Sequence, residues 1–354
     1  MSIWLLCAAC FQYSDGPHRI MRGMTDQDDA HTLHIVGHFD DPHTGAERSL
    51  PDLAAALRGR RICRLWSDVA PHPVFAAQGV RAIDLNTGTF PRGGSLLVGG
   101  VHVQLGPWLE HAGPSQVTLR YNLPNHLRLF DVITRIRDGT GRDPALVFVS
   151  RAMQQSVGLP GRVEPSLIRI EPFLDTAVER PQRAVTVGRL SRDVIEKHDP
   201  GDVAVYRALA ARGMQVRVMG GTCLGRWLAG VPGIELLSAG AQDPVSFLAS
   251  LDIFFYRTGT FIEPYGRVVM EAMASGLPVV AAANGGFAEQ IRHGVDGFLV
   301  QTQEQALQAL AVLAANRSVR EQAGRSAREA CVAIHGTASF ERQVENYLEP
   351  YDRD

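Results

Sequence analysis

The sequence predicts an α/β protein made of two consecutive domains, each with a doubly wound parallel sheet. The chain has 354 residues, and at roughly 150 residues per domain this length indicates two domains. Short apolar segments typical of buried strands alternate with segments whose apolar residues repeat at helical spacing. This alternation favours parallel sheets with helices on both faces. A stretch with charges and two prolines, 172–181, would serve as the linker.

The N-terminal domain is expected to cover residues 33–175, after an appendage at 1–32. Helices are expected at 45–57, where Leu50, Leu53 and Leu57 repeat at helical spacing, and at 127–136. The expected strands are 33–37, 61–66, 82–85, 95–98, 116–121, 145–150 and 167–170.

The C-terminal domain is expected to cover 182–335, and a final helix in 336–354 would pack back on the first domain. Its expected strands are 183–188, 214–219, 234–237, 251–256, 278–282 and 297–300. Its expected helices are 203–212, 267–275, 286–293, 304–313 and 319–334, followed by 340–351. Doubly wound sheets bind ligands beyond the carboxyl ends of their strands, so two facing domains would share one cleft.

Composition limits the function classes. With 45% hydrophobic and 20% charged residues and a formal charge of -2, nothing favours a nucleic-acid partner. The five cysteines are irregularly spaced, which argues against a disulfide framework and for a reducing, cytoplasmic setting. Cys7 and Cys10 form a Cys-x-x-Cys pair, and we expect free thiols there because no second pair supports a zinc or redox site. The apolar start is too short to span a bilayer and lacks the charge pattern of a signal peptide.

The segment from Glu263 to Val280 carries the most chemistry. Seven residues separate Glu263 from Glu271. Glu263 precedes a proline and should lie in a loop, whereas Glu271 should lie inside the following helix. The N–H groups of Tyr265, Gly266 and Arg267 would be free donors at the helix N-terminus, a site suited to phosphate. Carboxylates suit vicinal diols, so the two glutamates could hold a sugar and a ribose on either side of that phosphate.

This segment resembles the retaining GT-B glycosyltransferases that carry a glycosyltransferase group 1 (family 4-like) domain. The resemblance rests on Glu-x7-Glu with Pro-Tyr-Gly after the first Glu and Glu-Ala-Met-Ala-Ser-Gly-Leu-Pro-Val-Val from the second. It covers about 184–313 well and the N-terminal half loosely. It implies two Rossmann-like domains facing across a cleft. It also implies that Glu263 contacts donor-sugar hydroxyls and Glu271 the ribose.

The loop after the strand at 183–188 resembles the Gly-Arg…Lys loop of that family, whose cations hold the donor diphosphate. Arg189 matches it directly. The usual lysine position, five residues on, is Val194 here, and Lys197 comes three residues later. Lys197 is therefore the expected second cation, with Arg192 as its competitor.

On the N-terminal side, the resemblance places the loop after the first strand near the donor phosphates, where Gly45 permits close backbone approach. His38 and Asp40 in this loop are candidates for the acceptor side. Many family members carry a histidine at the end of a central N-terminal strand, and Asn122 lies there in this sequence. No metal is expected.

The sequence therefore predicts a hexosyltransferase-type glycosyltransferase that moves a sugar from a UDP- or GDP-sugar to an acceptor hydroxyl with retention. Glu263, Arg189 and Lys197 would form the catalytic group, and the leaving diphosphate would take the acceptor proton. The nucleotide-sugar is a co-substrate, and no cofactor is expected. The acceptor is an unknown glycan, lipid-linked or small molecule, and peripheral contact with the inner membrane is compatible with it. The alternative is an inactive nucleotide-sugar-binding partner subunit, suggested by the irregular lysine spacing and the missing histidine.

Overall fold

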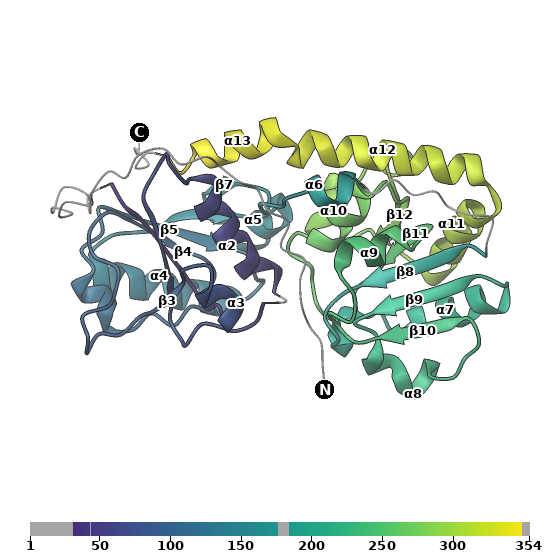
Figure 1. Ribbon diagram of the computed structural model, residues 1–354, viewed down its shortest axis with the longest axis horizontal. Coiled ribbons are helices and arrows are strands. Elements are labelled where there is room, and N and C mark those ends of the chain that lie inside the picture. The colour runs from purple at the N-terminus through teal and green to yellow at the C-terminus, as the bar shows by residue number, and fades with distance from the viewer. Residues whose placement is uncertain (1–30, 43, 176–183, 349–354) are drawn as a thin grey trace, which may run out of the picture.

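The computed structural model describes residues 31–42, 44–175 and 184–348, which form two α/β units side by side (Figure 1). The N-terminal sheet has the order β3-β2-β1-β4-β5-β6-β7, and all its strand pairs are parallel. Its strands are β1 (Leu33–Gly37), β2 (Cys63–Ser67), β3 (Arg81–Ala82), β4 (Ser95–Val98), β5 (Gln116–Tyr121), β6 (Ala145–Phe148) and β7 (Arg162–Val163). The order reverses between β1 and β4, which makes the sheet doubly wound.

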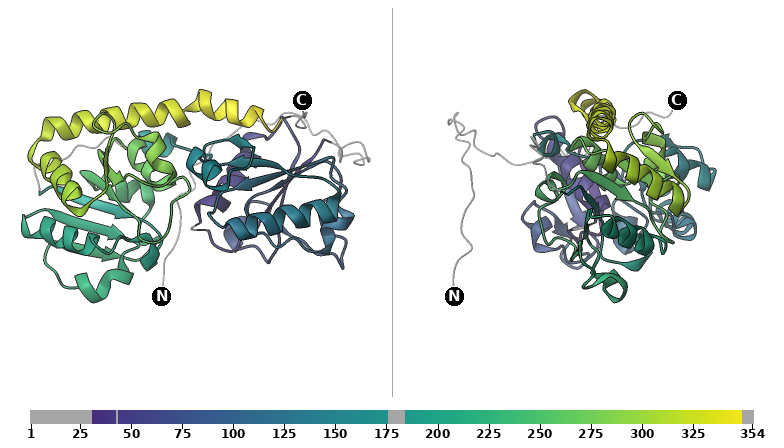
Figure 2. Two further views of the ribbon diagram at one scale, coloured as in Figure 1. Left: turned by 180° about the vertical axis from the view of Figure 1, so that it is seen from behind. Right: turned by 90° about the vertical axis from the view of Figure 1, so that its right-hand side faces the viewer.

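The helices of this unit cover both faces of the sheet. They are α2 (Gly45–Ala56), α3 (Pro73–Ala76), α4 (His126–Thr140), α5 (Arg151–Val157) and α6 (Glu171–Leu174), with a short 3-10 helix at Pro107–His111. The long helices α2 and α4 lie on opposite faces, as the front and back views show (Figures 1 and 2). Asn125 caps α4 by accepting a hydrogen bond from the Arg128 N–H, and the left-handed Gly141 ends the helix.

The C-terminal sheet has the order β10-β9-β8-β11-β12-β13, again all parallel. Its strands are β8 (Thr186–Leu190), β9 (Gln215–Met219), β10 (Ile234–Leu237), β11 (Ile253–Tyr256), β12 (Val279–Ala282) and β13 (Phe298–Val300). Its helices are α7 (Asp202–Ala211), α8 (Gly225–Leu228), α9 (Pro244–Ala249), α10 (Arg267–Ala274), α11 (Gln303–Ala315) and α12 (Arg317–His335). The 3-10 helices η2 (Ile195–Lys197), η3 (Thr222–Leu224) and η4 (Gly286–Gln290) lie in its loops.

The last helix, α13 (Thr337–Glu345), continues from α12 across to the N-terminal unit (Figure 1). Val344 and Tyr347 are buried in the same apolar cluster as Leu33 and Ile35 of β1. The Tyr347 hydroxyl donates a hydrogen bond to the buried Glu164 at 2.8 Å. The last described residues therefore pack on the N-terminal unit.

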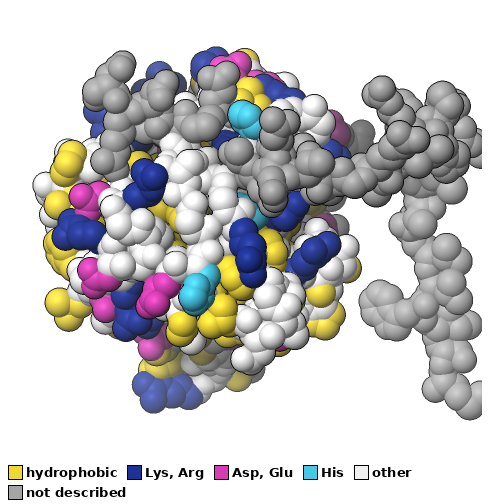
Figure 3. Space-filling view, turned by 90° about the vertical axis from the view of Figure 1, so that its left-hand side faces the viewer, with side chains coloured by type: hydrophobic (Ala, Val, Ile, Leu, Met, Phe, Trp, Pro, Cys, Tyr) yellow, Lys and Arg dark blue, Asp and Glu magenta, His cyan; other side chains and the backbone are white. Residues whose placement is uncertain are grey.

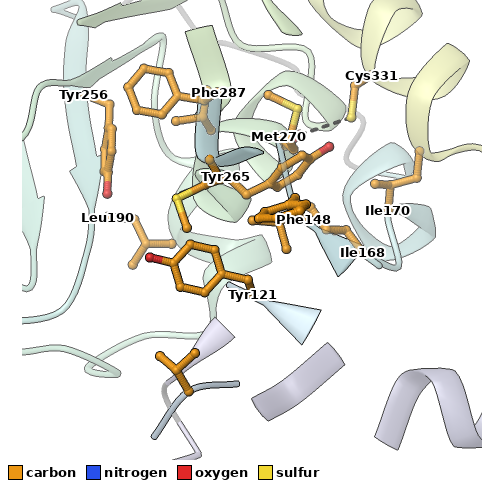
Figure 4. Packing of buried hydrophobic residues seen from close by; sticks show 14 of the residues in the cluster. Tyr121, Phe148, Ile168, Ile170, Leu190, Tyr256, Tyr265, Met270, Phe287 and Cys331 are labelled. Carbon is orange, nitrogen blue, oxygen red and sulfur yellow. Dashed lines mark hydrogen bonds between the residues drawn. The ribbon is translucent and has the colours of Figure 1, made fainter. Parts of the chain in front are cut away.

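Buried side chains join the two units into one apolar cluster. Tyr121 and Phe148 from the N-terminal sheet belong to the same cluster as Tyr265, Met270 and Phe287 from the C-terminal unit (Figure 4). This shared core fixes how the loops at the two sheet ends face each other.

Four local predictions are wrong. The segment 167–170 is not a strand: Ile168 and Ile170 are buried by packing against the other unit, and the edge strand is β7. The strand expected at 82–85 is reduced to Arg81–Ala82. The helix expected at 286–293 is the shorter η4, because the chain becomes extended at Ile291. The strand expected at 145–150 ends at Phe148, and Ser150 instead caps the unpredicted helix α5.

Three stretches lie outside the described part of the chain: residues 1–30 with Cys7 and Cys10, most of the expected linker, and the last six residues.

Candidate functional site

Glu263 lies in the loop between β11 and α10, where two donors meet its carboxylate. The Lys197 ammonium donates a hydrogen bond to Glu263 Oε2 at 2.6 Å. The Tyr256 hydroxyl, at the end of β11, donates to the same oxygen at 2.8 Å. Both side chains of the ion pair are largely buried, with 8% of Lys197 and 14% of Glu263 exposed. The structure thus brings the first motif glutamate and the displaced lysine into one contact.

Lys197 reaches Glu263 because the η2 turn redirects the chain after Val194. Its ammonium also lies 3.6 Å from the centroid of the Phe261 ring, a cation–π contact. Burial lowers the Lys197 pKa, and the neighbouring Glu263 carboxylate opposes that shift. Arg192, the competing cation, lies farther out, with its guanidinium carbon 5.8 Å from the same ring centroid. Among the cations predicted from sequence, Lys197 is the one in contact with the motif.

Lys197 is also the only lysine in the chain, among 35 lysine and arginine residues in total. Arginine supplies every other permanent cationic side chain. An ammonium is a compact point charge, whereas a guanidinium is a planar fork. The single lysine against the motif glutamate therefore indicates a site that is shaped for the smaller cation. Simple counting of residue types could have drawn attention to this residue.

Arg189, at the end of β8, lies deeper than the sequence suggested. Its side chain is fully buried, and it donates hydrogen bonds to the carbonyls of Arg257, at 2.5 Å, and of Lys197. Its guanidinium carbon also lies 4.4 Å from the centroid of the Tyr256 ring. In this structure Arg189 therefore supports the two residues that hold Glu263 and does not itself line the open surface.

The N-terminus of α10 follows Glu263 directly. Gly266, the residue before the helix, has a φ of 81°, a left-handed conformation that favours glycine. The Tyr265 side chain points into the core, where its hydroxyl is 2.7 Å from His335 Nε2 (Figure 4). The first N–H groups of α10 have no intrahelical acceptor, so this end of the helix favours an anion.

Glu271 lies one turn farther along α10 and is 5% exposed. Its carboxylate makes no hydrogen bond or ion pair with another residue described by the structure. The Glu271 carboxylate raises the pKa of Arg267, which burial lowers. The structure does not place Glu271 against Glu263. It leaves the Glu271 carboxylate available to a ligand.

The N-terminal unit meets this helix through the β1–α2 loop. A Cβ atom added to Gly45 would lie 2.7 Å from Cδ of Arg267. Arg267 in turn donates a hydrogen bond to the carbonyl of Leu167 at 2.5 Å. Gly45 therefore lies against the side chain of Arg267, the first residue of α10.

Two acceptor-side candidates, His38 and Asp40, lie toward the other end of the same loop, and the third, Asn122, follows β5. His38 Nδ1 is 2.9 Å from Oδ1 of Asp68, and Nε2 is 3.3 Å from Oδ2 of Asp40. The amide nitrogen of Asn122 donates a hydrogen bond to the carbonyl of Gly99 at 3.0 Å. Sequence reasoning missed Asp68, since nothing in its immediate sequence marks it. Within the described residues, no three His, Cys, Asp or Glu side chains converge so as to hold a metal ion.

Two buried histidines near the site predict an acid-sensitive fold. Burial, reinforced by Arg189, lowers the pKa of His198 to about 4, and burial with Arg267 lowers the pKa of His335 to about 3. The ordinary value of 6.5 applies when the chain is unfolded. As the pH falls below about 6.5, the unfolded chain takes up protons at these histidines that the folded chain does not, so their contribution to stability decreases toward pH 4, whereas burial raises the pKa of Asp202 to about 7 and its contribution has the opposite sign. For His198 alone the loss amounts to about 3 kcal/mol.

Denaturant unfolding from pH 7.5 to 4 measures this loss. His198→Gln should flatten the slope of the unfolding free energy against pH. An equal slope in both proteins would contradict this assignment.

Comparisons with known proteins find one family model and several relatives. Residues 235–330 match the family model described as glycosyl transferases group 1. D-inositol 3-phosphate glycosyltransferase of Mycobacterium bovis strain BCG is 30% identical over 239 residues, which are 60% of this chain and 48% of that protein. Spore coat protein SA of Bacillus subtilis is 28% identical over 135 residues, or 34% of this chain and 35% of that protein. The chain spans less than half the length of the curated relatives it matches.

Solved structures extend the likeness to the whole fold. Anabaena HepE in complex with UDP-glucose superposes with a TM-score of 0.68 at 18% identity, covering 90% of this chain and 99% of that one. WaaG, a glycosyltransferase involved in lipopolysaccharide biosynthesis, gives 0.64 at 13% identity, with 88% and 98% covered. These likenesses confirm the predicted architecture of two Rossmann-like units. Residues 235–330 therefore form a glycosyl transferases group 1 domain, and the chain as a whole has the GT-B fold of these solved structures.

Proposed function

We propose that the protein transfers a sugar from a UDP- or GDP-linked donor to an acceptor hydroxyl, with retention of the anomeric configuration. The observation that carries the proposal is the 2.6 Å contact between the chain's only lysine and Glu263 at the start of α10. Negative charge grows on the diphosphate as the glycosidic bond breaks, and a fixed ammonium beside a helix N-terminus stabilises that charge.

Each residue has a role in this proposal. Lys197 and the first N–H groups of α10 hold the diphosphate, Glu263 accepts hydrogen bonds from donor-sugar hydroxyls, and Glu271 accepts them from the ribose. Arg189 supports Lys197 and Tyr256 through its buried contacts. The acceptor oxygen bonds to the anomeric carbon as the bond to the diphosphate breaks, and the diphosphate oxygen takes the acceptor proton. The barrier falls through positioning and electrostatics, without an enzymic nucleophile.

The proposal also covers the cellular compartment in which the protein acts and the class of acceptor. A cytoplasmic setting fits the free thiols of Cys63, Cys223 and Cys331 in the described residues. No helix among those residues is long and apolar enough to cross a bilayer. The names of the curated relatives make a phosphorylated polyol one acceptor to test, beside glycans and lipid-linked molecules.

The N-terminal unit carries the feature that supports peripheral contact with an anionic membrane. A groove of about 1000 Å³ there is lined by Asp52 and by Arg58, Arg60, Arg61, Arg64, Arg81 and Arg169, of which Arg60 is paired with Glu341 and Arg169 with Asp52. On the outer end of the same unit, cationic side chains lie in separate groups, so any membrane contact there would be local (Figure 3). Anionic lipid headgroups attract such clusters by roughly 1 kcal/mol per arginine near the surface.

Donor binding is the experiment that tests the proposal. Thermal unfolding with UDP-, GDP- and ADP-sugars should identify one that stabilises the fold by about 2.7 kcal/mol at 100 times its dissociation constant. Glu271→Gln should weaken that donor about tenfold, because an amide is a poorer acceptor for a diol than a carboxylate. Arg142→Glu, at an exposed position after α4, is the matched control and should bind like the wild type. The absence of stabilisation by any nucleotide-sugar or nucleoside diphosphate would refute the proposal.

The second candidate, an inactive nucleotide-sugar-binding subunit, is favoured by one observation. Asn122 takes the place of the histidine found in many related enzymes, and its amide is committed to the carbonyl of Gly99. Donor binding without hydrolysis or transfer, across a broad acceptor panel, would support this candidate over the enzyme.

A further inference from the structure

The arginine-lined groove of the N-terminal unit lies beside the point at which the chain enters its first strand. Its walls are the second half of α2, residues 58–66 leading into and through β2, and residues 77–81 leading into β3. Because residues 58–62 precede β2, the groove reaches the amino edge of the sheet, whereas the β1–α2 loop leaves the sheet at its carboxyl edge. The groove is therefore separate from the candidate donor site.

Acidic side chains of the described residues balance only part of the positive charge in this groove. Two of its arginines have such partners: Arg60 pairs with Glu341, and Arg169 with Asp52. Asp52 is the one acidic residue among the lining residues. The side chains of Arg58 and Arg81 are exposed and make no hydrogen bond or ion pair with a residue that the structure describes. The groove therefore has a net positive charge.

Arg61 adds a charge whose hydrogen bonds all end on neutral oxygens. Its guanidinium donates to the carbonyl of His31 at 3.0 Å, to the carbonyl of Tyr347 at 2.7 Å and to the hydroxyl of Ser95 at 2.8 Å. Burial lowers the pKa of this guanidinium, so an anion nearby would stabilise its charged form. With Arg58 and Arg81, Arg61 makes the groove suited to an anionic segment.

The chain supplies such a segment directly before His31. The preceding residues are Asp26-Gln-Asp28-Asp29-Ala30. Because a chain spans at most about 3.6 Å per residue, the α-carbons of Asp28 and Asp29 cannot be farther than about 11 Å from that of His31, and that of Asp26 not farther than about 18 Å. Since Arg61 binds the His31 carbonyl, three carboxylates are tethered beside the groove. Such short tethers correspond to effective concentrations on the order of millimolar.

We propose that the acidic segment 26–29 occupies the arginine-lined groove of its own chain, so that any other anion, lipid headgroups included, has to displace it. A second acidic segment, 349–354, follows Tyr347 and therefore also lies near Arg61 in the chain. It has three acidic residues and one arginine in six positions, whereas 26–29 has three aspartates and no cation in four. The denser negative charge favours 26–29 as the occupant. The inference goes beyond sugar transfer and does not depend on it.

Cys63, a half-buried free thiol that lines the groove, reports the local electrostatic potential. Alkylation of the full-length protein by anionic iodoacetate and by neutral iodoacetamide is followed by peptide mapping. Both reagents attack the thiolate, so the ratio of their rates depends on the potential and not on the thiol pKa. At about 10 mM ionic strength, the triple variant Asp26→Asn/Asp28→Asn/Asp29→Asn should raise the ratio at Cys63 at least threefold. The ratio at Cys223, in the C-terminal unit, should not change.

The matched control removes three exposed carboxylates elsewhere: Glu110→Gln/Asp138→Asn/Glu329→Gln. These three residues form no ion pair with a residue of the described chain, and the control changes the net charge by the same amount. Its ratio at Cys63 should therefore stay close to that of the wild type. Equal ratios in the two triple variants would overturn the proposal. An increase found only when the acidic residues of 349–354 are replaced by their amides would overturn the choice of 26–29.

Binding of an added acidic peptide supplies the reciprocal test. A fluorescent hexa-aspartate peptide, followed by anisotropy at the same ionic strength, should bind the triple asparagine variant at least about tenfold more tightly than the wild type, because the groove is then open to it. Adding Arg58→Gln and Arg81→Gln to that variant should abolish the gain. Equal affinity for the wild type and the triple asparagine variant would overturn the proposal, and so would a gain that persists without the two arginines.

Discussion

Replacing Glu263 by glutamine is expected to lower the turnover number by about 100- to 1000-fold, the range measured when one charge-stabilising group is removed from an active site. The substitution keeps the size of the side chain but removes the charge that faces Lys197 at 2.6 Å. It weakens the hold on the donor sugar and leaves a buried ammonium without its partner. Steady-state kinetics with the donor identified by the binding screen give the size of the effect.

Glu196→Gln is the matched control for this experiment. Glu196 lies next to Lys197 in η2, is exposed, and forms no ion pair with a residue that the structure describes. Its turnover should stay within about twofold of the wild type, because an exposed charge in water contributes little. Wild-type turnover in Glu263→Gln would remove Glu263 from the mechanism.

Replacing Lys197 by methionine is expected to lower kcat/KM by about 1000-fold. Methionine keeps the apolar stem but removes the ammonium, so the donor diphosphate loses its charge partner and Glu263 keeps only the hydroxyl of Tyr256. Lys197→Arg should recover little activity, because a planar fork differs in shape from an ammonium enclosed by Glu263 and Phe261. The measurement is kcat/KM for the donor at saturating acceptor.

Arg192→Gln tests the competing assignment. Arg192 is exposed and lies over the outer side of the Phe261 ring, so we expect a loss of less than fivefold. A larger loss in Arg192→Gln than in Lys197→Met would transfer the diphosphate contact from Lys197 to Arg192.

The sequence predicted the regular parts of the fold because alternating apolar segments report burial directly. The prediction of strands failed where apolar residues are buried by a contact other than strand pairing. Ile168 and Ile170 are buried by the contact between the two units, and the apolar pattern alone cannot distinguish this from pairing in a sheet. The helix α5 was missed because it follows β6 after only two residues, and the apolar run of the strand continues to Val149, next to the residue that caps the helix.

The candidate site was predictable where it follows one stretch of chain. Glu263, Gly266, Arg267 and Glu271 lie within nine consecutive positions, and local backbone rules place them. Contacts between residues far apart in the sequence could not be predicted from the sequence. The short turn η2 compensates for the irregular spacing of Lys197, and the pairing of His38 with Asp68 depends on two strand ends that meet only in the folded sheet.

The most direct test of the donor site uses the chain's single lysine. As the pH rises above 9, a growing fraction of a lysine amine is unprotonated, and this fraction of Lys197 can react with a small acylating reagent; burial lowers the Lys197 pKa. Peptide mapping by mass spectrometry separates this amine from the α-amino group, since the chain contains no other lysine. With the donor at 100 times its dissociation constant, the acylation rate of Lys197 should fall at least tenfold, because about 99% of the sites are then occupied. An unchanged rate under donor saturation would show that Lys197 does not contact the donor and would contradict the account.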